Sequence, residues 1–417
     1  MSRVLLVNLS SPELDRLAAE LAMRNALMGM VRRYVNKGRS WERALASIPV
    51  VGGAYAKTLG RRLPPAGLHG ELIREAGIAA DFAGALAHRL GRTLPGLALR
   101  LSKRLLLATE CAVARAASRL VERADRVVCG YHVARPAFQR ARALARPTLL
   151  NYPIAHHRWQ YRLYEEQARR NPRFAAALPN FGNQDAHAAT LDGEIELADV
   201  VLVGSRFVRD SFVSEGVPSE RIRIIPYGCD TERFQPPAAP RAGSVFRVLF
   251  VGQVGERKGM SYLLNAYQSF RKPDTELHVV GDYVAGSEVY RPYQHLYHHT
   301  PHVPQSQLPQ LLGSADVLVF PTLVEGMPMV VLEAMACGLP VIATPRGADE
   351  VVRDGIDGFV IPPCDSEAII DRLQHLYDHT ELRLRMGRNA RAQAMRWSWS
   401  RYAQSAADLV LEATTGA

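Results

Sequence analysis

The sequence predicts an α/β fold made of two halves, each with its own parallel sheet. The chain has 417 residues, too many for one small core, and its 47% hydrophobic content is ordinary for a globular protein. Short apolar runs alternate with helical patterns, which is typical of parallel sheets covered on both faces. Between the halves, Pro236, Pro237 and Pro240 precede Gly243, and paired prolines cannot continue a helix. We therefore expect a linker there.

The first half begins with the apolar run Val4–Val7, which predicts a buried strand. Ser11 and Pro12 then indicate a helix start, because serine caps helices and proline suits the first turn. Residues 30–120 are rich in Ala, Leu and Arg and have a mostly helical pattern. Further expected elements are strands at Arg126–Cys129, Thr148–Tyr152, Asp199–Val203 and Arg223–Pro226, and a charged helical stretch between Trp159 and Pro179.

The second half has the more regular pattern. Its expected strands are Phe246–Val251, Glu276–Val280, Asp316–Phe320, Pro340–Thr344 and Gly358–Ile361. Its expected helices are Ser261–Phe270, Ser306–Leu312, Met329–Cys337 and Ser366–Tyr377. Two similar α/β halves predict two Rossmann-like domains. Because such sheets bind ligands beyond the carboxyl ends of their strands, the loops after Val251, Val280 and Phe320 are the places to look.

Charge and cysteine usage indicate the binding partners and the cellular compartment of the protein. In residues 1–150, 25 Lys or Arg against 10 Asp or Glu give +15, whereas 26 against 31 in the remainder give −5. A basic first third suits an anionic membrane, a phosphate-bearing substrate or nucleic acid, or it is only a solvated arginine-rich surface. The five cysteines are scattered, and no apolar run predicts a transmembrane helix or a secretory signal. We therefore expect the protein to reside in the reducing cytosol.

The segment from Phe320 to Pro340 follows a strand, turns and begins a helix. Free backbone N–H groups at Met329, Val330 and Val331 would form an anion site at the helix start. Glu333 lies on an otherwise apolar helix, so its carboxylate needs a partner. Ribose hydroxyls or a structural salt bridge with an arginine would both serve.

A second segment, from Phe250 to Gly259, also joins a strand to a helix. Gly252 and Gly255 would let the backbone approach a ligand, and Arg257 and Lys258 could neutralise a diphosphate. The alternative is a basic loop with solvated side chains. A Walker sequence, with its phosphate-binding glycines and lysine, is absent.

Histidines stand at two notable places. His156 and His157 follow a predicted strand, where they face either a ligand or solvent. His295, His298, His299 and His302 form a cluster in sequence, but no Cys or carboxylate lies among them, and the chain has no Asp-x-Asp. The sequence therefore predicts no metal site.

These segments resemble the donor half of retaining GT-B glycosyltransferases of family 4 (glycosyl transferases group 1). Glu325 and Glu333 match the E-x7-E motif of that family within EGMPMVVLEAMACGLPVIAT, which GADEVVRDGIDGFVIPP follows. FVGQVGERKGMSYLLNAY resembles its first donor loop, and VLVGSRFVRDSFVSEGVPSERIRIIPYGCD its domain junction, so the likeness spans roughly residues 198–400.

The resemblance implies a GT-B fold, with two Rossmann-like domains facing across a cleft. It implies an acceptor-binding domain at 1–235, a linker at 236–243, a donor domain at 244–397, and a C-terminal helix at 398–417 that packs toward the first domain.

The resemblance also implies residue roles. Lys258 would contact the donor diphosphate, Glu325 the hydroxyls of the transferred sugar, and Glu333 the ribose, while His156 or His157 would lie near the donor sugar. Gln253 stands where the family usually has arginine. The remaining implied donor-site residues are Gly252, Arg257, Val303, Gly326, Met327, Met329, Val330 and Val331.

The implied function is transfer of a sugar, with retention of configuration, from a nucleotide-diphosphate sugar to a glycan or lipid-linked acceptor in polysaccharide or glycolipid synthesis. No metal or other cofactor is expected. Residues 31–64 mix eight cations with apolar side chains, so we expect a cytoplasmic enzyme that is peripheral at the inner face of an anionic membrane. The alternatives are a binding protein that lost transfer, which Gln253 permits, and a nucleic-acid-binding protein, which the two glutamates disfavour.

Overall fold

The computed structural model describes residues 2–48, 55, 59–90, 95–179, 184–238, 245–284, 286–301, 303–348 and 350–412. Two compact units make up the chain. One contains residues 1–152, 185–202 and 402–417, and the other contains 153–184 and 203–401. The predicted domain limits divide the chain by its two sheets, whereas the two units are divided by how compactly their residues pack. The predicted limits therefore stay a prediction. Of the predicted linker, residues 239–243 lie outside the described residues.

The first sheet has the strand order β3-β2-β1-β4-β5-β6-β7. Strands β3 to β6 pair in parallel along this order, and β1 (Val4–Val7) lies between β2 (Leu27–Arg32) and β4 (Arg126–Gly130). The other strands are β3 (Ile73–Glu75), β5 (Thr148–Asn151), β6 (Val200–Val203) and β7 (Ile222–Ile224). The expectation of mostly helix over residues 30–120 missed β2 and β3. The sequence of β2, LMGMVR, has weak strand propensity, so its pairing with β1 decides its conformation.

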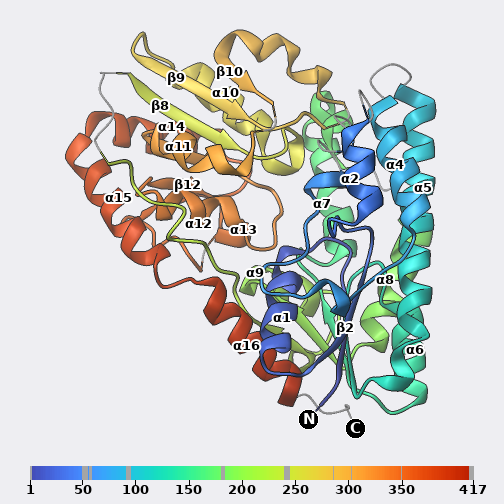
Figure 1. Ribbon diagram of the computed structural model, residues 1–417. Helices are drawn as coiled ribbons and strands as arrows, with labels where there is room; N and C mark the ends of the chain where they lie inside the picture. Colours follow the sequence, from blue (N-terminus) through green and yellow to red (C-terminus); the bar gives the residue numbers. More distant parts are fainter. Residues whose placement is uncertain are drawn as a thin grey trace. The chain divides into compact units, whose positions relative to one another are not determined.

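The helices of this first unit follow the alternation of its sheet (Figure 1). They are α1 (Pro12–Met23), α2 (Ser40–Ser47), η1 (Leu59–Arg61), η2 (Gly70–Leu72), α4 (Ile78–Leu90), α5 (Pro95–Ser118), η3 (Val121–Arg123), α6 (Arg135–Ala143) and α8 (Gln184–Leu197).

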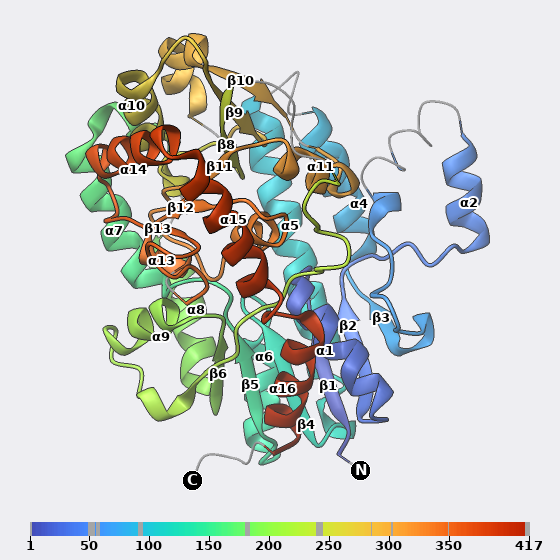
Figure 2. The same ribbon diagram turned by 90° about the vertical axis from the view of Figure 1, so that its left-hand side faces the viewer.

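The chain returns to the first unit at its end. Helix α16 (Trp399–Glu412) belongs to this unit from Tyr402 onward, as the predicted fold class requires. It lies beside α1 (Figure 2), and Asp408 forms an ion pair of 2.5 Å with Arg24, the residue that ends α1.

Three of the apolar side chains in residues 31–64 that were expected to face a membrane are internal. Val31 on β2 and Tyr34 and Val35 just after it are fully buried, and the ring centroids of Tyr34 and Phe82 lie 4.8 Å apart. Cations of the same segment are paired: Arg32 bonds Asp15 at 3.0 Å and Lys37 lies 3.5 Å from Glu75. The expectation that apolar residues of this segment face lipid is therefore wrong for Val31, Tyr34 and Val35, whereas Trp41 and Ile48 are 42% and 46% exposed. Val50 and Lys57 lie outside the described residues.

The second sheet has the order β10-β9-β8-β11-β12-β13, and its strands are parallel. The strands are β8 (Phe246–Val251), β9 (Thr275–Val280), β10 (Tyr297–Thr300), β11 (Val317–Phe320), β12 (Val341–Ala343) and β13 (Gly358–Val360). The five predicted strands of this half are present. Edge strand β10 was missed, because YHHT is short and polar.

The helices of the second unit include two from the middle of the chain. They are α7 (His157–Arg170), η4 (Pro172–Ala177), α9 (Arg206–Val213), η5 (Ser219–Arg221), η6 (Glu256–Lys258), α10 (Met260–Phe270), η7 (Ser287–Leu296), η8 (Gln305–Gln307), α11 (Leu308–Gly313), α12 (Met329–Ala336), α13 (Pro345–Ala348), α14 (Ser366–Asp378) and α15 (Thr380–Ala394). In the described part of the chain, no helix combines the length and hydropathy needed to cross a bilayer.

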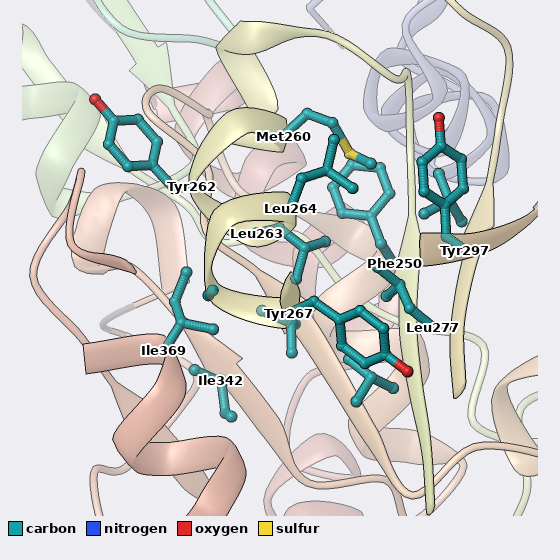
Figure 3. Close-up of a cluster of buried hydrophobic side chains, with 14 of the residues drawn as sticks. Phe250, Met260, Tyr262, Leu263, Leu264, Tyr267, Leu277, Tyr297, Ile342 and Ile369 are labelled. Carbon is teal, nitrogen blue, oxygen red and sulfur yellow. The ribbon is translucent and has the colours of Figure 1, made fainter. Parts of the chain in front are cut away.

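The core of this unit lies between α10 and one face of the sheet. Figure 3 shows Met260, Leu263 and Leu264 of α10 directed at the strand residues Phe250 and Leu277. Phe250, Leu263, Leu264 and Leu277 are fully buried. Burying each of these side chains contributes roughly 1.5–3 kcal/mol, so α10 and the strands hold the loop between them in place.

Gly259 joins η6 to α10 and permits the tightest approach in that loop. Its φ is +72°, and a Cβ on it would stand 2.0 Å from the carbonyl oxygen of Pro321. Gly355 has the same φ of +72° but open space around the position of a Cβ. A comparison of the two glycines therefore distinguishes the cost of the left-handed backbone from the cost of close packing.

We expect Gly355→Ala to lower the free energy of unfolding by about 1 kcal/mol, the cost of a left-handed alanine. Gly259→Ala should cost about 1–3 kcal/mol more, because the loop after β11 must move away. Denaturant unfolding of both variants measures the difference. Equal losses would contradict a close approach at Gly259.

Candidate active site

Two strand–loop–helix segments of the second unit are joined at the carboxyl ends of β8 and β11. The N–H of Leu323 donates to the carbonyl of Arg257 at 2.9 Å, and the hydroxyl of Thr322 donates to the same carbonyl at 3.2 Å. Residues some 65 positions apart therefore form one surface. This is the edge at which parallel sheets bind ligands.

Lys258 and Glu325 form the centre of this surface. The ammonium of Lys258 is in direct contact with Oε2 of Glu325, and it lies 4.7 Å from the ring centroid of Phe320. Nη1 of Arg257 reaches the same carboxylate oxygen at 3.3 Å and the carbonyl of Val324 at 3.1 Å. Sequence reasoning did not identify Phe320, although its place at the end of β11 is a signal for it.

Opposing effects act on the charge of the Lys258 ammonium group. Burial lowers its pKa well below the usual range for lysine, and the neighbouring Arg257 guanidinium adds to that effect. The carboxylate of Glu325 opposes both, because contact with a negative charge favours the ammonium form. A buried cation beside a carboxylate and an aromatic face is a site prepared for negative charge.

Glu256 stabilises the loop between β8 and α10 through buried hydrogen bonds. The sequence did not indicate this role. Its carboxylate is buried, and it accepts hydrogen bonds from the Ser261 hydroxyl and, at 3.1 Å, from the Tyr290 hydroxyl. Burial raises its pKa to about 7. Because the carboxylate is satisfied by the protein, we assign it to fixing the turn before α10 rather than to a ligand.

The loop after Glu325 is fixed by close packing. The carbonyl of Gly326 accepts a hydrogen bond of 2.7 Å from the Ser205 hydroxyl, and a Cβ on Gly326 would stand 1.7 Å from the carbonyl oxygen of Pro153. The sulfur of Met327 accepts the N–H of Tyr227 at 2.9 Å. The segment that begins at Pro153 therefore lies against the Glu325 loop.

The predicted anion site at the start of α12 is smaller than expected. The N–H of Val331 donates to the carbonyl of Pro328 at 3.1 Å, so the expectation of a free N–H there is wrong. The first turn closes on itself, which leaves Met329 and Val330 to face a ligand. At the other end of α12, Arg391 donates to the carbonyl of Ala336 at 2.9 Å and stabilises the negative end of the helix.

Glu333 lies on the second turn of α12 and is half-buried. Among the described residues its carboxylate has no hydrogen bond or ion pair, and the charge of Arg233 lowers its pKa from a distance. Burial is the larger effect and raises its pKa to about 7. Of the two partners considered from sequence, a salt bridge with an arginine is thus not formed.

His156 and His157 are both buried and belong to the same unit as Glu325. Their rings stack at 4.3 Å, and the His156 ring meets Phe212 edge-on at 4.8 Å. Nδ1 of His156 accepts the N–H of Arg158 at 3.2 Å, so this residue caps α7. The alternative of solvated surface histidines is therefore wrong, because both side chains pack inside the unit.

The remaining predicted residues lie around the ends of β8 and β9. The N–H of Gly252 donates to Val280, and a Cβ on Gly281 would stand 1.9 Å from the Gly252 carbonyl oxygen. Gln253 is exposed and Val303 half-buried. In the described chain, neither Glu325 nor Glu333 belongs to a group of three side chains with metal-ligand geometry.

Comparisons with known proteins agree with this architecture. A family model described as "Glycosyl transferases group 1" matches residues 245–379, and one described as "Glycosyltransferase Family 4" matches residues 52–233. Both sheets lie largely within these two ranges.

Among curated proteins, the chain is 31% identical over 229 residues to D-inositol 3-phosphate glycosyltransferase of Paenarthrobacter aurescens, covering 50% of this chain and 56% of that protein. It is 33% identical over 226 residues to a GDP-mannose-dependent phosphatidylinositol monomannoside mannosyltransferase of Mycolicibacterium smegmatis, covering 48% and 59%. The match thus spans little more than half the length of these relatives.

Among solved structures, the Anabaena HepE protein in complex with UDP and glucose has a TM-score of 0.65 at 16% identity, over 99% of this chain and 100% of that one. Sucrose-phosphate synthase from Thermosynechococcus elongatus has a TM-score of 0.66 at 19% identity, over 98% of each chain. Likeness at these identities shows the fold alone, and it confirms the predicted GT-B fold class.

The unpaired carboxylate of Glu333 predicts a pH-dependent stability. Its pKa of about 7 in the folded state exceeds the value near 4.3 expected in the unfolded state, so the folded state binds more protons between these values and stability falls as pH rises. Glu333→Gln should therefore be more stable than the wild type at pH 8, by roughly 1–2 kcal/mol after discounting for solvent, and the gain should vanish toward pH 4.

Unfolding at several pH values measures this effect. Glu381→Gln, an exposed position on α15, is the control and should leave the difference from the wild type flat. A pH-independent effect of Glu333→Gln would show that burial does not raise the pKa of that carboxyl group.

Proposed function

This chain belongs to the group 1, family 4 glycosyltransferases, and from that premise we propose that it transfers a sugar from a nucleotide-diphosphate sugar to an acceptor with retention of anomeric configuration. The observation that carries this proposal is the contact of Lys258 and Arg257 with Glu325 at the carboxyl ends of β8 and β11. This contact brings two cations and a carboxylate together, which supports a diphosphate site beside a site for sugar hydroxyls.

The cations act on the leaving group. As the bond from the anomeric carbon to the diphosphate oxygen breaks, negative charge develops on the diphosphate. Lys258, Arg257 and the N–H groups of Met329 and Val330 stabilise that charge without reorganising. The acceptor oxygen bonds to the anomeric carbon on the face that the diphosphate leaves, and its proton passes to a departing phosphate oxygen. The step needs no metal and no further cofactor.

The carboxylates position the donor. Glu325 accepts hydrogen bonds from hydroxyls of the transferred sugar, and Glu333 accepts them from the ribose, which supplies the partners that its half-buried carboxylate lacks in the protein. The packing of Pro153 against Gly326 supports a place for His156 or His157 beside the sugar. Gly252, Gln253, Gly326, Met327 and Val303 complete the donor site.

The acceptor is a glycan or lipid-linked molecule of the cell envelope. Two relatives in the comparisons are named for inositol phosphate and phosphatidylinositol mannoside substrates, which supports a polyol or lipid-linked hydroxyl as the acceptor. The second candidate is a binding protein that holds the donor without transfer. The exposed Gln253, which leaves one cation fewer at the diphosphate, favours it.

Transfer should depend on the ion pair and not on a divalent metal. With UDP- and GDP-sugars offered against polyol and lipid acceptors, Glu325→Gln should lower kcat by about 10²-fold or more, because interactions made in the transition state are lost. Lys258→Ala should lower kcat more than Arg257→Ala, since Lys258 is the more buried cation. EDTA should leave the rate unchanged.

Three results bear on the alternatives. Donor binding without turnover in the wild type would favour the binding protein. Complete loss with EDTA, restored by added metal, would contradict the cation-assisted mechanism. A Glu325→Gln enzyme with most of the wild-type rate would remove Glu325 from the site.

A membrane-contacting surface is supported by α5 rather than by residues 31–64. On this helix, Leu101 and Leu107 are 47% and 59% exposed, and the cations Arg100, Lys103 and Arg104 are exposed between them. These three cations form no ion pair within the described chain. Each cation near an anionic bilayer contributes about 1 kcal/mol, and the leucines can enter the headgroup region. We therefore place the enzyme at the cytoplasmic face of an anionic membrane.

Sedimentation with vesicles tests this surface. Binding should require anionic lipid and weaken with salt, and the double variant Leu101→Asp, Leu107→Asp should reduce the bound fraction severalfold. Leu384→Asp, at a 50% exposed leucine of α15, is the matched control and should bind like the wild type. Equal binding by the variant and the control, or none by the wild type at low salt, would contradict a membrane surface on α5.

A further inference from the structure

Strands β9 and β10 bring two histidines and a glutamate together on one face of the second sheet. The strands pair in parallel with His298 opposite His278, so these two side chains project from the same face. Glu276 precedes His278 by two residues and shares that face, because side chains alternate along a strand. The carboxylate that the histidine cluster lacked in the sequence is thus supplied by the neighbouring strand.

The three side chains have the spacing of metal ligands. One nitrogen of each histidine and a carboxylate oxygen of Glu276 all lie within 4.8 Å of one another. The rings of His278 and His298 are 5.1 Å apart. Nε2 of His278 is buried and has no hydrogen bond, although Oε2 of Glu276 lies 3.3 Å away. The contact of this buried ring nitrogen with the carboxylate falls short of hydrogen-bond geometry, and a cation held between the carboxylate and the two imidazoles would satisfy it.

We propose that Glu276, His278 and His298 bind a divalent cation of the Zn²⁺ type. Imidazole nitrogen and carboxylate oxygen are ligands that Zn²⁺, Co²⁺, Ni²⁺ and Cu²⁺ accept, whereas Mg²⁺ and Ca²⁺ prefer oxygen alone. Ligands at about 2.0–2.1 Å from a tetrahedral ion stand roughly 3.3 Å apart, so modest side-chain rotations close the site. Water would complete the coordination.

Arg247 both supports and limits this site. Its Nε donates to Oε1 of Glu276, and its Nη1 donates to the carbonyl of Ser314 at 2.9 Å. The guanidinium therefore orients the carboxylate and leaves Oε2 for the cation. Its positive charge also repels the cation, so the affinity should be lower than that of a three-histidine site. The competing interpretation is an Arg247–Glu276–His278 charge network with no metal.

The site is separate from the donor site. His278 stands three residues before Gly281, the residue that follows β9, and Glu276 stands five before it, which is roughly 10–16 Å along the strand. A cation there would tie edge strand β10 to β9. It would thereby hold Thr300, whose carbonyl accepts the N–H of Gly281 at 2.9 Å. The role is structural and independent of the transfer chemistry.

Calorimetric titration of the tag-free full chain with ZnCl₂ tests the proposal, together with thermal unfolding in Zn²⁺ and in EDTA. We expect one Zn²⁺ per chain at this site, a melting temperature that rises with Zn²⁺ concentration, and at least tenfold weaker binding in His298→Ala. His298 is exposed, so its removal should leave the fold intact. Glu276→Gln and His278→Ala should weaken binding in the same direction.

Two histidine variants serve as controls. His299 is the next residue on β10, and its Nε2 lies 2.8 Å from the carbonyl oxygen of Gly281, so His299→Ala should retain Zn²⁺. His375 and His379 form another close pair, with rings 4.6 Å apart. If His375→Ala weakens binding and His298→Ala does not, or if the wild type binds no Zn²⁺, the proposal is wrong.

Discussion

The ion pair of Lys258 and Glu325 is the interaction on which the site of the second unit depends. It joins two loops that lie 67 residues apart, and both partners are largely buried. A buried ammonium without a carboxylate would pay a large desolvation penalty, so neither loop can hold its conformation alone. The hydrogen bonds from Leu323 and Thr322 to Arg257 and the close approach at Gly259 join the same two loops.

Two other carboxylates of this unit differ in their hydrogen bonding: the protein supplies partners for one and not for the other. Glu256 accepts bonds from Ser261 and Tyr290 and holds its turn, whereas Glu333 has no hydrogen-bond partner in the described chain. Burial raises the pKa of both to about 7. A carboxylate held in apolar surroundings without a partner destabilises the free protein, and such a cost is typical of a residue kept for a ligand.

The first unit shows a different use of charge. Arg32 and Lys37 of residues 31–64 pair with Asp15 and Glu75, whereas Arg100, Lys103 and Arg104 of α5 stay exposed among leucines. Net charge is therefore a poor guide to a docking surface until the pairing of each cation is known. Similarly, His298 has only other histidines as potential ligands near it in the sequence, and strand pairing brings Glu276 and His278 of β9 close to it.

Local pattern determined much of this protein in advance. The alternation of apolar runs and helices predicts the strands from β8 to β13 apart from β10, because buried parallel strands are continuous apolar segments bounded by turns. The residues around Glu325 and Glu333 and around Arg257 and Lys258 likewise predict two strand–loop–helix segments, since the residues of each segment are close in sequence. Only the tertiary structure decided which side chains meet across strands and loops. Strand β2 exists because β1 pairs with it, Val31 and Tyr34 are internal because β2 carries them inward, and Glu276 meets His298 because of the parallel register of β9 and β10. These features depend on long-range pairing, and the free energy of such contacts is absent from any short window of sequence.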